Sequence, residues 1–445
     1  MEQDLAYQLA YQRGVQAVIW GMPAVSIAAL REATFRDLGA RYNDIVYMSN
    51  VPEPRHELLT VSDQAPYVMV MANLKDGPVV LDVPPATDQV AFAGSAVDAW
   101  MVPIADVGPA GEDAGRGGKY LFLPPGFKDQ APKGYLPAPS KTYDVHVVLR
   151  PVASAGGTLA DAVAYSKRLR AYPLAQSGRS PANRYIDAYP KAWRAVPAYD
   201  MSYFETLAQV INDEPLQEKD AAMIGLLASL GIRKGTPFLP EGRLARALEL
   251  AVKDGRRQME HYFETPGLAM APYRPDSHWM VSNATPHEGA TYLVDGRLLV
   301  DERAGGYAYW ATFAPKKQGQ GTYCLRALRD SSGQLLKGTG LYRLRIPRQV
   351  PARDGWSVTV YGKESKTYLH NDLNRTGLSS RDNGQLRLNA DGSVDLYFGP
   401  QAPGGRISNW IPTAERDFFL IFRLGGPEKA VFDRSFKLPD IEKVH

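Results

Sequence analysis

The residues that could do chemistry in this sequence are few, and the first group stands where a loop is expected to enter a strand. Asp63 and Tyr67 place a carboxylate near a phenol, and such groups can act as acid, base or oriented donor, although Asp63 could equally be a turn residue. Arg375 lies in a polar loop shortly before Ser379, where a guanidinium and hydroxyls could bind a carboxylate or ester oxygen. We predict Asp63, Tyr67 and Arg375 as catalytic and Ser379 as substrate-binding, with a plain polar connection as the alternative for the loop.

Three further side chains are candidates for substrate binding. Trp100 and Trp410 offer flat rings of the kind that stack on sugars or aromatic ligands, while core packing is the plainer role for Trp410. Arg423 interrupts an apolar strand, and a buried guanidinium requires an acidic or carbonyl partner. The nearest carboxylates in sequence are Asp395 and Asp433. A structural pair and an anion-binding role both stay open for Arg423.

Strong catalytic signatures are missing from the sequence. HExxH, CxxC and GxSxG do not occur, which removes the usual support for zincin, redox-motif and nucleophile-elbow chemistry. The single cysteine, Cys324, rules out an intramolecular disulfide and a cysteine-based metal site. His278 and His287 could offer metal ligands, but their spacing gives no support for it. We predict no organic cofactor and no metal-binding residues, and leave a divalent metal open.

Composition describes an ordinary globular chain. Its 445 residues are enough for two or three domains, and 44% are hydrophobic and 22% charged. A net charge of +3, with basic residues in pairs rather than patches, predicts no nucleic-acid partner. No apolar stretch is long enough to predict a membrane span. The polar start lacks an export signal, so the chain as written is expected in the cytoplasm, or in the periplasm or outside the cell if a signal was trimmed.

The elements that must position these residues change in kind along the chain. The first twenty residues have helical spacing and predict an amphipathic helix that ends near Gly21-Met22-Pro23. Short apolar runs separated by Gly and Pro over 67–150 predict a sandwich or barrel. Helical spacing returns over 203–262, and strands follow from 301. The continuous apolar run Phe418–Phe422 predicts a strand buried between two layers.

Several motifs together resemble one bacterial family, the proteins that pair domains of unknown function 1254 and 1214. The motifs are LKDGPVV at 74–80, GPAG-x-D-x-G-x-GGKYL at 108–121, W-S-x-T-x-Y at 356–361, DGS-x-D-x-YFGP at 391–400, AP-x-G-x-x-x-NW at 402–410 and RL-x-GP-x-x-x-x-FD at 423–433. The resemblance implies two β-rich domains with helical insertions and brings no settled activity. One departure stands out. Where relatives usually read TP-N-N-D-T-x-Y, this chain has Ser62, Asp63 and Gln64, which would alter or abolish a role of the usual Asn/Asp pair.

These patterns predict a mainly β chain with helical insertions, of the α+β class. Two antiparallel β-sandwich or jelly-roll-like domains are expected, joined by a helical segment. The expected bounds are 1–29 for the N-terminal helix, 30–195 for the first β domain, 196–289 for the helical segment and linker, and 290–445 for the second β domain.

The expected function is an enzyme, a hydrolase or lyase, that acts on a neutral or weakly anionic small molecule at an inter-domain cleft. A first alternative is a non-catalytic protein that binds a carbohydrate or lipid-like ligand. A second is an interaction protein that forms a homo-oligomer. If the cleft exists, at least two of five residues are predicted to share one pocket: Asp63, Tyr67, Trp100, Arg375 and Arg423.

Overall fold

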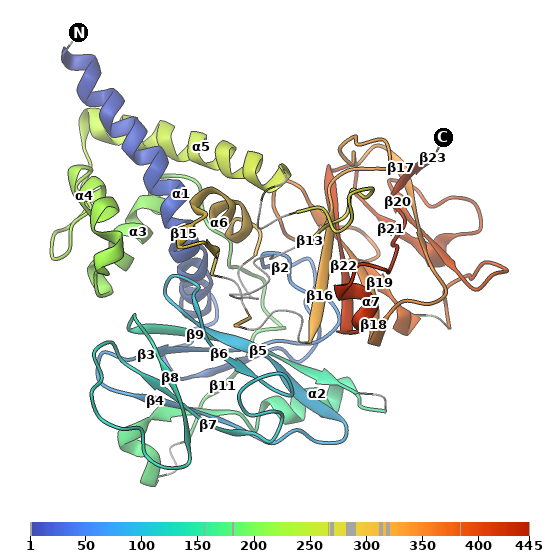
Figure 1. Ribbon diagram of the computed structural model, residues 1–445, viewed down its shortest axis with the longest axis horizontal. Coiled ribbons are helices and arrows are strands. Elements are labelled where there is room, and N and C mark those ends of the chain that lie inside the picture. The colour runs from blue at the N-terminus through green and yellow to red at the C-terminus, as the bar shows by residue number, and fades with distance from the viewer. Residues whose placement is uncertain are drawn as a thin grey trace.

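The chain is built from two β domains and a group of helices that packs against both (Figure 1). The structure, a computed structural model, describes residues 2–154, 156–179, 182–265, 267, 271–281, 291–310, 315–316, 321–382 and 384–444. Most strand pairs are antiparallel. The predicted α+β class, with two β domains and a helical segment between them, is confirmed.

The N-terminal β domain packs a six-stranded sheet against a four-stranded one. In spatial order the larger sheet is β11 (Tyr185–Asp187), β1 (Ile45–Tyr47), β3 (Val68–Asn73), β9 (Asp144–Ala153), β5 (Val90–Asp98) and β6 (Pro103–Val107). The smaller is β10 (Arg170–Pro173), β4 (Val79–Val83), β7 (Gly118–Leu123) and β8 (Tyr135–Pro139), and β2 (His56–Glu57) pairs with β12 (Trp193–Arg194). Helix α2 (Leu159–Ser166) begins with a capping box formed by Thr158 and Asp161.

The C-terminal β domain also has two sheets around one core. The first is β13 (Met280–Val281), β16 (Thr322–Ala327), β22 (Phe418–Pro427), β18 (Ala352–Gly362) and β19 (Gly377–Ser379). The second is β21 (Trp410–Pro412), β20 (Val394–Gly399), β17 (Leu341–Ile346) and β23 (Glu442–Val444), with the short helix α7 (Lys429–Phe432) nearby. A separate hairpin joins β14 (Leu293–Val294) to β15 (Arg297–Leu298).

Strand β22 is buried on both faces, as its continuous apolar sequence predicts. Leu420 and Phe422 pack in the core between the two C-terminal sheets, whereas Phe419 and Ile421 join the core shared with the helices. Arg423 is on the same face as Phe419 and Ile421 because alternate strand residues point the same way. The face of this sheet that carries Arg423 is therefore directed toward the rest of the molecule.

Helices α1 (Glu2–Arg36), α3 (Met201–Asp213), α4 (Ala221–Ser229), α5 (Gly242–Glu264) and α6 (Val300–Tyr307) form the helical unit. Helices α1 and α5 cross closely at two glycines. A Cβ atom added at Gly14 would lie 2.7 Å from the Ala251 Cβ, and one added at Gly255 would lie 2.7 Å from the Val18 Cγ1. Both positions therefore require glycine for the helices to meet.

The predicted end of the first helix, near Gly21-Met22-Pro23, is wrong, and so is the bound of 29 for that segment. Helix α1 runs through Pro23 to Arg36. An internal proline costs about 3 kcal/mol, because it removes one backbone N–H and crowds the preceding turn. Residues 15–28 of α1 are almost all buried against α3, α5 and α6, so tertiary packing outweighs this cost.

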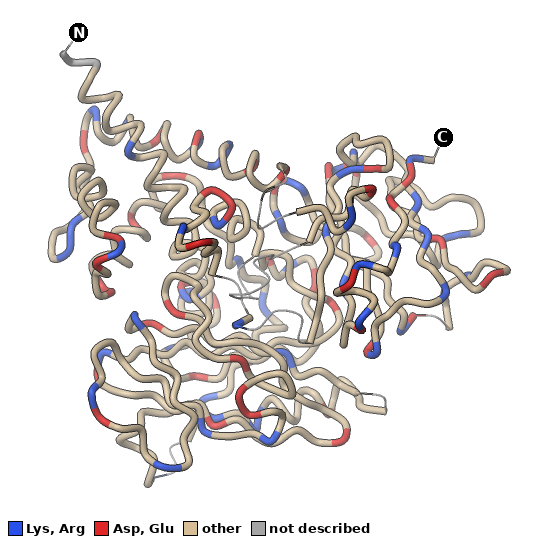
Figure 2. Tube along the Cα trace, in the orientation of Figure 1, with Lys and Arg blue, Asp and Glu red and all other residues tan. Residues whose placement is uncertain are grey.

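The same helix is long and apolar enough to cross a membrane by composition, but 83% of its most apolar window is buried inside the protein. That burial is typical of the core helix of a globular unit. Figure 2 shows basic and acidic residues interspersed over all three units. The segment predicted as helices and linker, 196–289, contains the strand β13 within its described part, and α6 belongs to the helical unit although it lies after residue 290.

Candidate functional site

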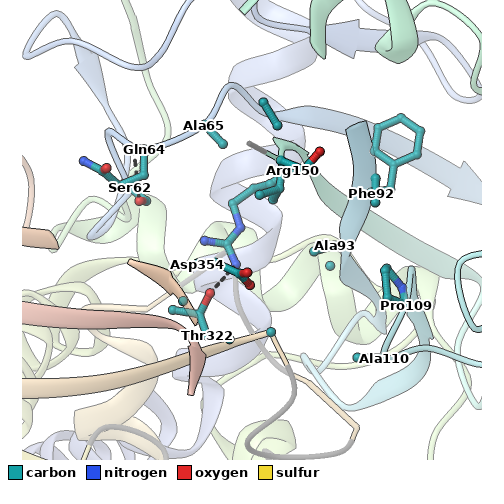
Figure 3. Close-up of a pocket in the computed structure, with 18 of the residues that line it drawn as sticks. Ser62, Gln64, Ala65, Phe92, Ala93, Pro109, Ala110, Arg150, Thr322 and Asp354 are labelled. Carbon is teal, nitrogen blue, oxygen red and sulfur yellow. Dashed lines mark hydrogen bonds between the residues drawn. The ribbon is translucent and has the colours of Figure 1, made fainter. Parts of the chain in front are cut away.

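A cleft of about 1150 Å³ lies between the two β domains. Strands β5 and β9 and the loop after β6 line it from the N-terminal domain, and β16, β18 and β22 line it from the C-terminal domain. Figure 3 shows Phe92 and Pro109 on one side, Thr322 and Asp354 on the other, and the side chain of Arg150 extending between them. A ligand in this cleft would touch both domains.

The floor of the cleft adjoins a small inner chamber of about 30 Å³, room for about one water molecule or one carboxylate oxygen. Four residues line both spaces: Ser62, Arg150, Thr322 and Arg423. Thr60, Tyr67, Trp310 and Cys324 complete the chamber. Two of these eight side chains are cationic, and no carboxylate lines the chamber among the residues that the structure describes. The chamber thus favours an anionic group.

Arg423 is 8% exposed and is hydrogen-bonded without a carboxylate partner in the described chain. Its guanidinium donates to the Thr60 carbonyl at 2.8 Å, to the Tyr361 hydroxyl at 2.8 Å and to Thr359 Oγ1 at 3.2 Å. Thr60 belongs to the N-terminal domain, so Arg423 ties the two domains together. The positive charge itself is not neutralised by these neutral partners and acts on the chamber.

Neither carboxylate that the sequence offered as a partner pairs with Arg423. Asp433 is at the end of α7, where it accepts a hydrogen bond from the Ser435 backbone N–H. Asp395 is on β20, in the other sheet of the C-terminal domain, and its Oδ1 has no hydrogen-bond partner in the described structure. The predicted pairing fails because Asp395 is on the opposite sheet of the sandwich and Asp433 is at the end of a helix that follows β22.

Arg150, the second arginine of the chamber, comes from the N-terminal domain. It stands on β9, directly after the buried residues 145–149 of that strand. Its guanidinium donates from Nη2 to Thr322 Oγ1, on β16, at 3.2 Å. The side chain is half-buried, so part of it faces the open cleft. Arg150 and Arg423 therefore bring one positive charge from each domain to the same point.

The neutral groups of the chamber differ in what they can do. The Tyr67 hydroxyl accepts from the Ser62 backbone N–H at 3.0 Å, and no described residue accepts the phenolic proton, so that proton is available to a ligand. Burial raises the pKa of the Cys324 thiol, and the nearby Arg423 and Arg150 offset this only in part. Cys324 is therefore a thiol at neutral pH and a poor nucleophile.

The rim of the cleft carries charges of both signs. Arg353 donates two hydrogen bonds of 3.0 Å to its neighbour Asp354, which leaves this pair nearly neutral. The Asp106 carboxylate accepts from Ser95 Oγ at 2.8 Å and from the Lys316 backbone N–H at 2.9 Å. The floor of the cleft, by contrast, presents the two arginines Arg150 and Arg423, and no Asp or Glu lines the inner chamber in the described structure.

Asp63 lies beside the cleft rather than on its wall. Ser62 and Gln64 line the cleft, whereas the Asp63 carboxylate accepts from Thr376 Oγ1 at 2.8 Å and from Thr359 Oγ1 at 3.4 Å. Both hydroxyls belong to the C-terminal domain. A Cβ added at Gly377 would lie 2.5 Å from Asp63 Oδ2, so only glycine allows this approach. Asp63 thus bridges the domains, and its predicted catalytic role stays a prediction.

Three predicted residues of the C-terminal domain, Arg375, Ser379 and Trp410, are engaged in hydrogen bonds within that domain. Arg375 donates to the Ile407 carbonyl at 2.6 Å and to the Trp410 carbonyl at 2.9 Å. The Trp410 indole donates to the Gly399 carbonyl at 3.0 Å, and Ser379 Oγ donates to Asp382 at 2.9 Å. None of the three lines the cleft or the chamber. Ser380, next to Ser379, does line the cleft.

Trp100 packs against the helical unit. Its ring centroid is 4.4 Å from that of Trp20 on α1. The sequence-predicted set is therefore divided: Tyr67 and Arg423 line the same inner chamber, Asp63 is one residue from its wall, and the other side chains lie elsewhere.

No cluster of three or more His, Cys, Asp or Glu residues suited to a metal exists among the residues described. His278 pairs with Asp440 through a 2.7 Å contact from Nδ1, and His287 lies outside the described residues. The divalent metal that the sequence left open stays untested.

Arg150 was missed by the sequence reasoning, although a signal existed. It follows the mostly apolar run Val145–Leu149, which only His146 interrupts, just as Arg423 follows the run Phe418–Phe422. A charged residue directly after a buried stretch of strand requires a polar partner, and this signal occurs in each of the two domains. Ser62 and Thr322 carry no comparable signal, since single hydroxyls are common on loops and strand ends.

Comparisons with known proteins agree with this architecture. The model described as Protein of unknown function (DUF1254) matches residues 42–173, and the one described as Protein of unknown function (DUF1214) matches residues 321–429. Among the curated proteins, none matches the chain.

Two solved structures resemble the whole chain. The crystal structure of the VPA0106 protein from Vibrio parahaemolyticus is 19% identical, with a TM-score of 0.58 and coverage of 98% of this chain and 100% of that one. An uncharacterized protein from Burkholderia cenocepacia is 12% identical, with a TM-score of 0.42 and coverage of 98% and 95%. The first likeness shows a shared fold. With both family matches in one sequence and in the order the motifs indicate, this chain belongs to the family that pairs a DUF1254 domain with a DUF1214 domain.

Proposed function

We propose that this protein is an enzyme that binds a small, weakly anionic organic molecule in the inter-domain cleft and acts on it by elimination or hydrolysis. The observation that carries the proposal is the meeting of Arg150 and Arg423 at the inner chamber, whose described lining contains no Asp or Glu side chain. Guanidinium groups recognise carboxylate and phosphate oxygens through charge-assisted hydrogen bonds.

The chemistry that fits the chamber best is proton transfer next to a bound carboxylate. Two guanidinium groups would stabilise the negative charge that develops when a proton leaves the adjacent carbon. Tyr67, whose phenolic proton has no acceptor in the described chain, is placed to donate that proton to a leaving group. A carboxylate of the cleft lining, Asp106 or Asp354, would accept the proton that leaves the carbon. Hydrolysis by a cysteine nucleophile is disfavoured by the raised pKa of Cys324.

A non-catalytic ligand-binding protein is the second candidate, and one observation favours it. No carboxylate that could act as a general base lines the inner chamber in the described structure. The carbohydrate version of this alternative has less support, because neither Trp100 nor Trp410 lines the cleft. Turnover separates the two candidates.

The proposal can be tested with the purified full-length protein. Native mass spectrometry would detect a co-purified small molecule, and incubation with a metabolite extract followed by mass spectrometry would detect a consumed acidic compound. We expect consumption by the wild type, and at least a tenfold slower rate for Tyr67→Phe, which keeps the ring but removes the proton. A compound that binds without being consumed by the wild type would support the binding protein instead.

A further inference from the structure

A second feature of the molecule, separate from the cleft, is a fully buried arginine for which the described residues supply no hydrogen-bond partner. Arg326 on β16 is 0% exposed. Its Nε, Nη1 and Nη2 atoms have no partner among the residues that the structure describes. A guanidinium has five N–H donors, and burying such a charge without compensation costs several kcal/mol. Something must offset this cost.

The other buried cations described below each have a carboxylate or hydrogen-bond partner that offsets the cost of burial. Arg31 pairs with Asp144, and Lys366 pairs with Glu260 at 2.6 Å. Arg303 donates to the Trp20 carbonyl at 2.9 Å, and Arg423 makes three hydrogen bonds. Arg326 is the exception within the described part of the chain.

Aromatic rings surround the Arg326 guanidinium. Its Cζ lies 4.4 Å from the centroid of Phe263, in the last turn of α5, and 5.2 Å from that of Tyr309. Figure 1 shows α5 running from the helical unit to the C-terminal β domain, where β16 lies. Each cation–π contact stabilises the buried charge but satisfies none of the N–H donors.

The neighbouring phenols do not supply a counter-charge. The groups that act electrostatically on Arg326 are Tyr309 and Tyr292, and no carboxylate is among them. Burial raises the pKa of Tyr292 well above its ordinary value, so its phenol stays neutral at physiological pH. Within the described part of the chain, the guanidinium therefore has no counter-charge.

We propose that Arg326 is the centre of a buried binding site for a small monoanion, either a halide or the carboxylate of a small organic acid. Because the Arg326 side chain is fully buried, its surroundings have a low dielectric constant, which strengthens an ion pair between guanidinium and anion. Thr322, Cys324 and Arg326 are alternate residues of β16 and point to the same face, so this site lies two residues beyond the inner chamber wall. The inference does not depend on the proposed function of the cleft.

The test is the thermal stability of the full chain at constant ionic strength, with gluconate replaced stepwise by chloride or by formate. Both small anions fit an enclosed site that bulky gluconate does not. A ligand that binds only the folded state raises Tm, and we expect a rise of roughly 2 °C or more for the wild type. Arg326→Met, which removes the charge and keeps an unbranched side chain, should show no such rise. Arg345→Met, an exposed arginine on β17, is the matched control and should behave as the wild type.

A larger rise in chloride than in formate identifies a halide site, and the reverse identifies a carboxylate site. Equal anion dependence in the wild type and in Arg326→Met would overturn the inference, as would a wild type with no dependence on either anion. If Arg326→Met does not fold, wild-type crystals soaked in bromide decide the matter. An anomalous peak within hydrogen-bond distance of the guanidinium supports a halide site, and density for formate there after a formate soak supports a carboxylate site. The absence of both refutes the inference.

Discussion

Replacing Arg423 by methionine tests whether this side chain both joins the two domains through hydrogen bonds and supplies positive charge to the inner chamber. Three donated hydrogen bonds are lost, to Thr60, Tyr361 and Thr359. The Tyr361 hydroxyl keeps its 2.5 Å hydrogen bond to the Val61 carbonyl, whereas the Thr60 carbonyl keeps only a 3.4 Å contact from Tyr361. One acceptor is thus left nearly unsatisfied.

A stranded buried acceptor costs about 1–3 kcal/mol, and each hydrogen bond from a charged donor contributes about 1.5–3 kcal/mol. Removing the buried charge offsets part of this loss of stability, because the cost of desolvating the guanidinium disappears. The expected net loss of unfolding free energy is therefore about 3 kcal/mol. The assay is denaturant unfolding followed by tryptophan fluorescence, with the exposed Arg345→Met as control at about 0.5 kcal/mol or less. A loss of unfolding free energy below about 1 kcal/mol for Arg423→Met would show that its hydrogen bonds do not stabilise the contact between the domains.

Three further predictions concern Tyr361, Asp63 and Glu214. Tyr361→Phe should lose about 1–3 kcal/mol in the same unfolding assay, because the Val61 carbonyl then loses its donor. Asp63→Asn should lose about 1 kcal/mol and leave ligand binding unchanged, since its carboxylate contacts Thr376 rather than the cleft; a binding defect in calorimetry would contradict this. Burial raises the pKa of Glu214 from an ordinary 4.5 to about 7, so its contribution to stability is full below about pH 4.5 and is lost as the pH rises through 7. The unfolding free energy of the wild type should therefore fall more between pH 4.5 and pH 7 than that of Glu214→Gln, and the difference between the two falls should be at most about 3 kcal/mol. Parallel pH profiles of the two proteins would contradict this prediction.

Local patterns in the sequence predict the elements of this fold well where one physical cause acts alone. The run Phe418–Phe422 is apolar throughout because its two faces pack into two different cores, and this requires a strand between two layers. Pro23 is the opposite case. Its local effect opposes a helix, but α1 is enclosed by other helices, and that packing cannot be seen from the residues around position 23.

The candidate site was only partly predictable, because it is made by contacts between domains. Arg423 was noticed as a charge in an apolar strand, yet its partner is a backbone carbonyl at Thr60, and every residue offers such a group. Arg375 lies in a polar loop of the kind that often carries function, but its guanidinium is used by two carbonyls of the same domain. Sequence shows which side chains need a partner and does not show where that partner will be.

The central claim is that Arg150 and Arg423 give the cleft a site for an anionic group, and calorimetric titration with benzoate and benzamide tests it most directly. The two probes have the same ring and nearly the same shape, and differ in the charge of the carboxyl-derived group. We predict that the wild type binds benzoate at least tenfold more tightly than benzamide. Arg150→Gln should lose most of this preference while its unfolding free energy changes by about 1 kcal/mol or less, because Arg150 is half-buried. The control Arg348→Gln removes an exposed arginine that does not line the cleft and should keep the preference. Equal affinity of the wild type for the two probes, or an undiminished preference in Arg150→Gln, would contradict the account.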